Sequence, residues 1–314
     1  MAQANLARAN AGRPVTAVIV TYQSAATIGP ALASMRRGFD AGLLECVVVD
    51  NGSVDATLDI VGREAGWARI VATGKNNGFG LGCNIGFEKA TTPYVVFVNP
   101  DAVIEPDALR TMLSFMDGHP AAGIAGPAII EGDAADSAEY QMTGKRPTPA
   151  SVLRAAIPMI GRPVPSYPIL PGAAPSRTEW VCGAVLMARS ELMRRLNGFD
   201  PRFFLYWEET DLCLRAEQTG FEVWALGAAV ATHVGGASTQ SDDTKISGCI
   251  AKHYFQSRHY YLAKHHGRLA AAAAELGEFV LVALGALLDV LRGRGMRRLR
   301  PRLQARLFSQ PARR

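Results

Sequence analysis

Three carboxylates fall within four positions of one segment, directly after two aromatic residues. The segment 206–212 reads Tyr-Trp-Glu-Glu-Thr-Asp-Leu and contains Glu208, Glu209 and Asp211. Like charges held together in a partly dry cleft raise one another's proton affinity, which can turn a carboxylate into a general base near neutral pH. The adjacent glutamates are the candidates for that base. Asp211 is spaced to pair with Arg215 one helical turn later, and acids also stabilise a helix N-terminus without any chemistry.

Two apolar runs in the first hundred residues stop abruptly at acid. Three valines precede Asp50, and Val-Val-Phe-Val precedes the triplet Asn-Pro-Asp that ends at Asp101. A strand-end carboxylate such as Asp50 can accept hydrogen bonds from a nucleobase or a ribose, whereas Asp101 can hold a divalent cation beside a diphosphate. Each motif also has a simpler interpretation, because Ser53 can cap the next helix and Asn-Pro-Asp is a common turn.

A glycine-rich segment and a histidine add further candidates. Residues 76–84 read Asn-Asn-Gly-Phe-Gly-Leu-Gly-Cys-Asn, and Cys83 stands where a dinucleotide fingerprint has its third glycine or alanine. Backbone amides at such a helix start can still approach a ligand, with Asn84 as a polar contact, or the glycines can allow close packing. His233 ends an apolar run before Gly-Gly-Ala-Ser, where a histidine can bind a metal or serve the structure alone.

Length and cysteine content bound the class of protein. A chain of 314 residues suffices for one large α/β domain or two smaller ones. Its five scattered cysteines, without a C-x-x-C pair, argue against a disulfide framework or a thiolate zinc site and fit a reducing cytosol. Residues 1–14 are polar and alanine-rich and lack the apolar core of a signal peptide, so we expect a short disordered lead.

The formal net charge of +5 conceals a division along the chain. Residues 292–314 hold nine arginines and no acid, whereas the rest carries 24 basic and 28 acidic residues. The run 269–291 is mostly apolar, but Glu275, Glu278 and Asp289 argue against a spanning helix. We expect an interfacial helix whose arginine-rich flank binds an anionic membrane surface; packing on the body or on a second subunit is the alternative. Few aromatic residues interleave these arginines, so we expect no nucleic acid partner.

The first 130 residues supply elements that can bring the polar groups together. Short β-branched runs alternate with segments of helical period, which predicts a mainly parallel sheet covered by helices. We expect strands at 15–21, 45–50, 68–72, 94–98 and 122–125, and helices at 24–37, 55–65, 79–90 and 105–117. Ligands of such sheets bind at the carboxyl ends of the strands, where Thr21, Asp50 and Asp101 would meet.

The second half is less regular at its beginning. Residues 147–175 contain eight prolines, so we expect 131–178 to form a loop or lid rather than helix or central strand. Regular structure should resume with a strand at 179–188, helices at 189–195 and 209–219, strands at 222–225 and 229–232, and helices at 248–265 and 269–291. The small and polar residues 235–243 should be mobile.

Six ordered motifs resemble glycosyltransferase family 2. They are Val-Ile-Val-Thr-Tyr at 18–22, Val-Val-Asp-Asn-Gly-Ser-Val-Asp at 48–55, Asn-Asn-Gly-Phe-Gly at 76–80, Asn-Pro-Asp at 99–101, Trp-Glu-Glu-Thr-Asp-Leu at 207–212 and His-Val-Gly-Gly-Ala-Ser at 233–238. The resemblance covers residues 15–262 and is strongest to the bacterial rhamnosyltransferase-like branch, whose members build cell-wall and surface polysaccharides. It implies an α/β fold of the GT-A type, a Rossmann-like mixed and mainly parallel sheet flanked by helices. Residues 263–314 would follow as a helical, basic segment that associates with a membrane or oligomerises.

The resemblance also implies an inverting, single-displacement transfer from a nucleotide sugar to a hydroxyl. Asp50 would hold the base, Asp101 the metal at the diphosphate, and His233 a further metal or phosphate contact. Glu209 stands where the family has its catalytic aspartate, with Glu208 in reserve, and asparagine replaces the first aspartate of the metal motif. The donor would be bound by Thr21, Tyr22, Asp50, Asn51, Asn77, Gly78, Asn84, Asn99 and Asp101, and the acceptor by Trp180, Cys182, Gly183, Trp207 and Asp211.

The expected cofactor is Mg²⁺ or Mn²⁺, and the expected donor is a dTDP- or UDP-sugar, with dTDP-rhamnose favoured. A glycan or polyprenyl-linked acceptor would be met at the inner face of the cytoplasmic membrane. Galactofuranose, glucose and N-acetylhexosamine donors stay open, as does a homo-oligomer. A nucleotide-sugar pyrophosphorylase should carry arginine and lysine in a glycine-rich loop after the first strand, where residues 21–25 read Thr-Tyr-Gln-Ser-Ala. A non-catalytic binding or scaffold protein is the remaining alternative.

Overall fold

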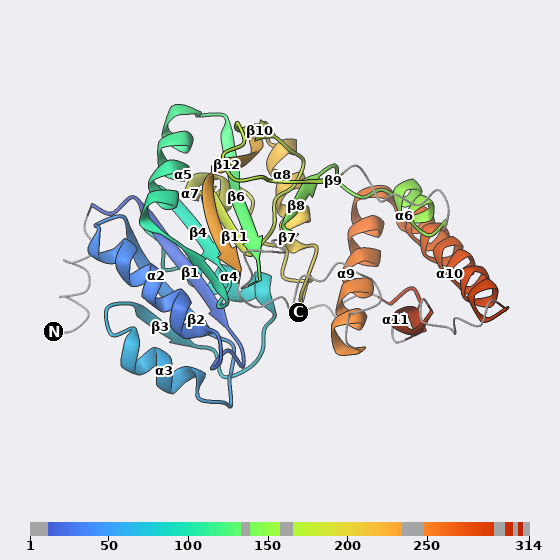
Figure 1. Cartoon of the computed structure of the whole chain (residues 1–314), viewed down its shortest axis with the longest axis horizontal. Coiled ribbons are helices and arrows are strands. Elements are labelled where there is room, and N and C mark those ends of the chain that lie inside the picture. The colour runs from blue at the N-terminus through green and yellow to red at the C-terminus, as the bar shows by residue number, and fades with distance from the viewer. Residues whose placement is uncertain are drawn as a thin grey trace.

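The computed structural model describes residues 12–132, 139–157, 166–233, 248–291, 299–303 and 307–309. Ten strands within these ranges form one mixed sheet (Figure 1). They are β1 (Val15–Thr21), β2 (Leu44–Asp50), β3 (Arg69–Ala72), β4 (Tyr94–Val98), β5 (Ala102–Ile104), β6 (Ala122–Glu131), β7 (Glu139–Tyr140), β10 (Ser176–Arg177), β11 (Val185–Arg189) and β12 (Glu222–His233). Their order is β10-β12-β6-β11-β4-β1-β2-β3, with β5 paired to β12 and β7 paired to β6.

Strands β3, β2, β1 and β4 run parallel, as the alternating sequence pattern predicted. β11 then runs antiparallel to both β4 and β6, while β6 and β12 are parallel to each other. Helices cover the sheet: α2 (Ile28–Asp40), α3 (Thr57–Glu64), α4 (Phe79–Phe87), α5 (Pro106–Gly118), α7 (Ser190–Arg195) and α8 (Glu208–Gln218). The predicted class, a mixed and mainly parallel sheet flanked by helices, is confirmed.

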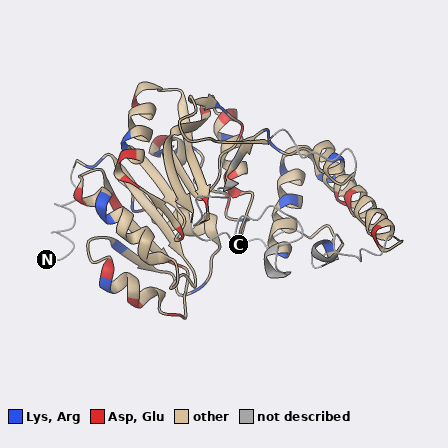
Figure 2. Ribbon diagram, in the orientation of Figure 1, with Lys and Arg blue, Asp and Glu red and all other residues tan. Residues whose placement is uncertain are grey.

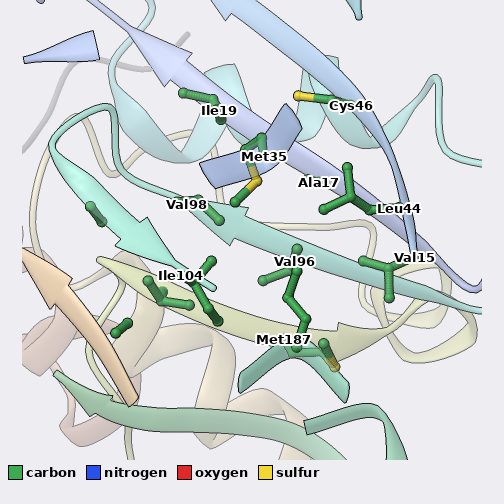
Figure 3. Close-up of a cluster of buried hydrophobic side chains, with 14 of the residues drawn as sticks. Val15, Ala17, Ile19, Met35, Leu44, Cys46, Val96, Val98, Ile104 and Met187 are labelled. Carbon is green, nitrogen blue, oxygen red and sulfur yellow. The ribbon is translucent and has the colours of Figure 1, made fainter. Parts of the chain in front are cut away.

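Apolar side chains of β1 alternate between the two faces of the sheet, because successive side chains of a strand point to opposite sides. Ala17 and Ile19 pack with Met35 of α2 on one face (Figure 3). Val18 packs with Cys83 of α4 on the other. Every residue of β1 is buried, as expected for a strand covered on both faces, and each large apolar side chain stabilises the fold by roughly 1.5–3 kcal/mol.

The pair formed by β6 and β12 differs from the sequence prediction. β12 is one strand where we expected two, and its register against β6 shifts between Leu226 and Val230. Leu226 pairs with Pro127, which has no amide proton to donate, so the ladder is interrupted there and the intervening residues bulge. β6 continues beyond this proline to Glu131, whereas the predicted strand stopped at residue 125.

The proline-rich stretch that we expected as a loop or lid contains regular structure. β8 (Met142–Gly144) and β9 (Ser166–Pro168) form a two-stranded sheet, and α6 (Pro149–Ala155) is a helix. Pro149 occupies the first turn, where its missing amide proton is not needed, and the Thr148 side chain caps the helix by accepting a hydrogen bond from Ser151 N. The prediction of no helix here was therefore wrong. The predicted mobile loop 235–243 lies outside the described residues.

The C-terminal helices lie beside the sheet rather than on it (Figure 1). They are α9 (Gly248–His266), α10 (Arg268–Leu291) and α11 (Arg300–Leu303), and the predictions for the first two are confirmed. α10 packs on α9 and α6, and a Cβ on Gly277 would lie 2.5 Å from Leu153 Cδ2, so glycine permits this close approach. Ser257 of α9 donates a hydrogen bond to Leu205 O at 2.9 Å, which joins these helices to the sheet domain.

The end of the expected disordered lead contacts the body. Arg13 lies over the Phe39 ring at 3.9 Å and donates a hydrogen bond to Leu44 O at 2.7 Å. Ordered structure therefore begins before residue 15, where we had placed the boundary. Residues 1–11 lie outside the described residues.

Candidate active site

The carboxyl ends of β1 and β2 lie side by side, because Thr21 and Asp50 are register partners. Thr21 Oγ1 donates a hydrogen bond to Asp50 Oδ1 at 2.9 Å. The Ser53 hydroxyl donates to the same oxygen, and the amides of Gly52 and Ser53 donate to Oδ2. Asp50 is fully buried, and these bonds hold the turn after β2. The neighbouring Tyr22 is 48% exposed and reaches the surface at this edge.

The glycine-rich segment begins α4 as predicted, but its polar residues serve the fold. Gly78 has a φ of +79°, and a Cβ there would lie 2.2 Å from Phe204 O. Phe79 N donates a hydrogen bond to that same oxygen at 2.9 Å. Asn51 Nδ2 donates to Gly78 O at 2.9 Å, and Asn77 Nδ2 donates to a backbone carbonyl of its own turn. Asn51 and Asn77 are buried, so they fix this loop rather than present a side chain to a donor.

Asn84, predicted as a ligand contact, makes two hydrogen bonds to the backbone of Phe199. Asn84 Nδ2 donates to Phe199 O at 2.8 Å, and Phe199 N donates to Asn84 Oδ1 at 2.8 Å. Gly198 packs against the same amide, since a Cβ there would lie 2.2 Å from Asn84 Oδ1. The side chain therefore joins α4 to the turn after α7.

Asp101 and His233, both predicted as metal ligands, meet at one edge of the sheet. His233 Nε2 lies 2.9 Å from Asp101 Oδ1, and His233 Nδ1 lies 3.4 Å from Glu131 Oε1. The His233 side chain is fully buried between these carboxylates. Burial alone would lower the pKa of His233, but the hydrogen bond with Asp101 and the negative charges of Asp101 and Glu131 outweigh burial and raise it to about 9.

Glu131 is the residue of this group that sequence reasoning missed. It follows Ile129-Ile130, an apolar run that stops at acid, which is the same signal that identified Asp50 and Asp101. The predicted strand ended at residue 125, so Glu131 fell at the start of the expected loop 131–178 instead of at a strand end.

The segment Cys182-Gly183-Ala184 connects this edge to the start of α8. Asn99 N donates a hydrogen bond to Ala184 O at 2.8 Å, which fastens the segment beside β4. A Cβ on Gly183 would lie 3.7 Å from both Cβ and Cγ of Glu209. The segment therefore contacts both the Asn-Pro-Asp turn and the candidate base.

The pKa of the Cys182 thiol depends on the carboxylates near it. Burial, followed by the negative charges of Glu209, Glu131 and Asp101, raises the pKa of Cys182 to about 12. Three carboxylates from three separate elements therefore lie within electrostatic range of one side chain.

The two glutamates that begin α8 have different surroundings. Tyr206 and Trp207 before them have φ values of +68° and +74°, which non-glycine residues rarely adopt and which cost on the order of 1–3 kcal/mol each. Glu208 is 3% exposed, and its Oε2 has no hydrogen-bond partner among the described residues. Glu209 is only partly buried beside Gly183. The strained turn thus directs one carboxylate inward and leaves the other at the site.

Burial shifts the acidity of both glutamates. It raises the pKa of Glu209 to about 7. For Glu208, burial and then the charge of Glu209 raise the pKa well above its ordinary value. The pair therefore binds protons more tightly than two exposed glutamates would, and Glu209 is the member with an exposed part beside Gly183.

Trp207 and Trp180, the two aromatic residues predicted to contact the acceptor, differ in their burial. Trp207 is 7% exposed and packs against Tyr254 and Tyr261 at centroid distances of 5.8 and 5.2 Å. The Trp207 ring therefore packs against α9. Trp180 is half-buried and donates a hydrogen bond to Lys145 O at 3.2 Å, with part of its ring exposed.

Asp211, also predicted as an acceptor contact, has no exposed surface. Its expected pairing with Arg215 is confirmed, with Arg215 Nε 2.7 Å from Asp211 Oδ2. Lys264 Nζ and His265 Nε2 of α9 lie 2.5 and 2.7 Å from Oδ1. Asp211 therefore fastens the helix that carries the glutamates to the C-terminal helices.

Asp101 and His233 offer an oxygen and a nitrogen ligand at the same edge. Within the described ranges, no cluster of three or more His, Cys, Asp or Glu side chains is arranged to hold a metal ion alone. Mg²⁺ and Mn²⁺ sites at phosphates need fewer protein ligands, because substrate oxygens and waters complete the coordination. The two residues fit a cation of that kind.

Known proteins resemble the chain in sequence and in fold. The sequence profile of glycosyl transferase family 2 matches residues 16–162. The N-acetylglucosaminyl-diphospho-decaprenol L-rhamnosyltransferase of Mycobacterium tuberculosis is 26% identical over 268 residues, which cover 79% of this chain and 84% of the relative. Rhamnosyltransferase WbbL of Escherichia coli K12 is 25% identical over 60% of this chain and 70% of its own length.

Solved structures agree with the fold. A mannosyltransferase from Pyrobaculum calidifontis, in complex with GDP-Man and Mn²⁺, superposes with a TM-score of 0.52 at 18% identity, over 96% of this chain and 91% of the other. TarS from Staphylococcus aureus gives 0.50 at 15% identity over 91% and 89%. With the sheet order and the motif positions described above, these likenesses show the GT-A fold, and residues 16–162 match glycosyl transferase family 2 in a chain that is similar to rhamnosyltransferases over a larger part of its length.

Proposed function

We propose that the chain is an inverting glycosyltransferase that moves a sugar from a nucleotide sugar to a hydroxyl of a glycan or lipid-linked acceptor. The observation that carries this proposal is that the segment 182–184 contacts both Glu209 and the turn that ends in Asp101, with both carboxylates in electrostatic range of Cys182. Inversion by single displacement needs a base at the attacking hydroxyl and charge stabilisation at the leaving diphosphate, on opposite sides of the anomeric carbon. A sugar bound over Gly183 would have both.

Glu209 is the proposed base. Its pKa of about 7 leaves a substantial fraction ionised at neutral pH, and the raised value also makes it a better proton acceptor than an ordinary carboxylate. Gly183 has no side chain to separate Glu209 from an acceptor hydroxyl. Glu208 is buried, and burial followed by the charge of Glu209 raises its pKa, so it suits a supporting role beside Glu209.

Asp101 and His233 are the proposed residues at the donor diphosphate. A divalent cation bound there would stabilise the charge of the departing nucleoside diphosphate. The Mn²⁺ in the mannosyltransferase of the same fold supports this assignment. Asp101 is 16% exposed in its side chain, so its carboxylate reaches the site while His233 lies beneath it.

The proposed donor is dTDP-rhamnose, and the proposed acceptor is a polyprenyl-diphosphate-linked glycan of cell-wall or surface polysaccharide synthesis. The names and coverage of the two rhamnosyltransferase relatives support both assignments. Such an acceptor would place the enzyme at the inner face of the cytoplasmic membrane.

The outward face of α10 supports this membrane location. Its large apolar side chains are about half exposed or more: Leu276, Val280, Leu284, Leu287, Leu288 and Leu291. Its acids Glu275, Glu278 and Asp289 are buried instead. A surface helix in water has the opposite arrangement, with charges outside and leucines inside. The ribbon coloured by charge shows α10 as mostly uncharged, with a few acidic positions (Figure 2).

Buried arginines neutralise the inward acids of α10. Arg302 Nη2 lies 2.5 Å from Glu275 Oε1, and Arg258 Nη1 donates to Glu278 Oε1 at 2.7 Å. By length and composition α10 is the one helix in the described ranges that could cross a membrane, and a third of its most apolar window is buried. We propose that it lies in the membrane interface, beside the arginine-rich residues 292–314 that attract anionic headgroups.

The test of the proposed function is a panel of nucleotide sugars, each with Mg²⁺ or Mn²⁺. Thermal stabilisation and slow donor hydrolysis without acceptor are the two measurements. We expect dTDP-rhamnose to raise the unfolding midpoint and EDTA to abolish the effect. Stabilisation by a different donor would change the sugar but keep the transferase, and no response to any nucleotide would favour the binding or scaffold role.

A further inference from the structure

Glu131 and His233 are fixed side by side by the sheet. Parallel pairing of β6 with β12 makes them register partners at the carboxyl ends of the two strands. Gly132 N also donates a hydrogen bond to His233 O at 3.2 Å. Their relative position therefore depends on backbone geometry, which a change of side chain leaves in place.

The facing side-chain atoms of this pair have no other partners. Glu131 Oε1 lies 3.4 Å from His233 Nδ1, slightly beyond a good hydrogen bond, and both atoms are buried without a hydrogen-bond partner among the described residues. An unpaired buried polar atom costs about 1–3 kcal/mol. A small approach of the two side chains would satisfy both atoms at once.

Glu131 has no cationic partner of the ordinary kind. Within the described part of the chain, its one ionic contact is His233, and no lysine or arginine pairs with it. Its side chain is only 10% exposed. A buried carboxylate held by a single imidazole is weak support for stability, so its position points to the histidine that it faces.

When an imidazole accepts a hydrogen bond or binds a metal through one ring nitrogen, a hydrogen bond at its other nitrogen orients the ring. The neutral ring carries one proton, and the hydrogen bond made by one nitrogen decides which nitrogen presents a lone pair. Carboxylates that accept the second ring proton orient metal-binding histidines in this way. In this chain Nε2 faces Asp101 and Nδ1 faces Glu131.

We propose that Glu131 is a positioning residue for the transfer reaction, accepting the Nδ1 proton of His233 so that Nε2 is directed to the cation and diphosphate beside Asp101. This inference rests on the proposed function, in which Asp101 and His233 lie at the donor diphosphate. Glu131 itself touches neither the cation nor the sugar.

Two variants separate hydrogen bonding from charge. Glu131→Gln has nearly the same shape and retains an oxygen that can accept the Nδ1 proton, whereas Glu131→Leu removes the acceptor. Mn²⁺ affinity of the full-length protein is measured by electron paramagnetic resonance with dTDP present, alongside the KM for the donor and the unfolding midpoint. We expect Glu131→Leu to weaken Mn²⁺ binding roughly 10–100-fold, with Glu131→Gln in between.

Glu45→Gln is the matched control. Glu45 is also a buried carboxylate of a central strand, and it accepts a hydrogen bond from Thr16 Oγ1 at 2.6 Å near the opposite end of the sheet. It should shift the unfolding midpoint without changing Mn²⁺ affinity. This comparison separates positioning from a general loss of stability.

The possible results distinguish failure of this inference from failure of the proposed function on which it rests. Equal Mn²⁺ affinity of wild type and Glu131→Leu would overturn the inference alone. Equal weakening in Glu131→Gln and Glu131→Leu would overturn hydrogen-bonded positioning and leave only a charge effect. A wild-type protein that binds no Mn²⁺ with dTDP would overturn the proposed cation site and the inference with it.

Discussion

His233 Nε2 lies 2.9 Å from Asp101 Oδ1, although 132 positions separate the two residues in the chain. The short strand β5 explains this, because it follows Asp101 directly and pairs antiparallel with β12, setting Ala102 opposite His233. The Asn-Pro-Asp turn and the last residue of β12 are thus joined by backbone hydrogen bonds. The contact is a property of the sheet and is independent of any ligand.

Replacing Asp101 with asparagine tests the donor site. The variant retains the size of the side chain but removes the charge that would hold a cation, so we expect turnover to fall roughly 10²-fold and the Mn²⁺ requirement to rise. Asp117→Asn is the control, since Asp117 accepts a hydrogen bond from Tyr94 far from the strand ends. Initial rates over a Mn²⁺ titration provide the measurement, and unchanged Mn²⁺ dependence in Asp101→Asn would contradict the site.

Replacing Glu209 with glutamine tests the base. We expect turnover to fall about 10²–10⁴-fold while donor binding is retained, because the amide cannot accept the acceptor proton. In the wild type, kcat/KM should rise with pH and level off above pH 7, since the base must be ionised. A flat profile from pH 5.5 to 8.5, or full turnover by the variant, would refute this role.

The same substitution has a consequence for stability. The pKa of Glu209 is raised from 4.5 to about 7 by burial, so the folded protein binds this proton more tightly than the unfolded chain does. Stability from this group is present below pH 4.5 and lost as the pH rises through 7. The difference in unfolding midpoint, Glu209→Gln minus wild type, should therefore increase from pH 5 to pH 8. At pH 4 the difference should show no such increase.

Gly78 and Gly74 both have a positive φ, but only Gly78 has neighbouring atoms close to the position of an added Cβ. Their φ values are +79° and +72°, which residues with a side chain rarely adopt, and Gly78 also has a ψ of 174°, a combination almost restricted to glycine. A Cβ on Gly74 meets no atom within 4 Å, whereas a Cβ on Gly78 would collide with the Phe204 carbonyl. We expect Gly78→Ala to lose a further 1–3 kcal/mol or so in chemical denaturation. Equal losses would mean that the loop around Phe204 yields freely.

Asp211 should matter for stability far more than an exposed aspartate in a similar pair. Burial would raise the pKa of Asp211, but His265, Arg215 and Lys264 outweigh it and lower the pKa. Removing one partner of a buried ion pair costs about 3–5 kcal/mol, so Asp211→Asn should approach that loss at pH 7. The depressed pKa means that this stability is present above pH 4 or so and disappears as the pH falls through the lowered value.

Asp40→Asn is the control for Asp211. Asp40 pairs with Arg36 four residues away, but both side chains are about half exposed, so its loss should stay below about 0.5 kcal/mol. Denaturant unfolding at pH 7 and pH 3.5 measures both variants. A loss for Asp211→Asn that does not shrink at pH 3.5 would contradict the assigned ion pairs.

The exposed leucines of α10 should drive binding to anionic vesicles. The double change Leu284→Ser and Leu288→Ser removes two adjacent apolar side chains from the outward face, and we expect vesicle-bound protein to fall at least tenfold in co-sedimentation. Val54→Ser, at an 86% exposed position in the sheet domain, should leave binding unchanged. Equal binding of all three proteins would favour packing of α10 against a second copy.

The sequence by itself determined the sheet and the acids at its edge. β-branched runs of four to seven residues cannot be buried except as strands, and their abrupt ends at Asp50 and Asp101 located the carboxyl edge before any coordinates. The spacing of Asp211 and Arg215 likewise fixed their pairing, because helical geometry alone brings them together. These are local properties, so sequence periodicity contains them.

Only the tertiary structure decided which polar groups are free to act. Asn84 and Asp211 have the same chemistry in the sequence as the active candidates, but Phe199 and the lysine and histidine of α9 occupy them. Glu131 became a candidate through its register with His233, a strand pairing across a hundred residues. Which carboxylate is exposed, which is paired and which has its pKa raised depends on neighbours distant in the chain, and local sequence does not encode those distances.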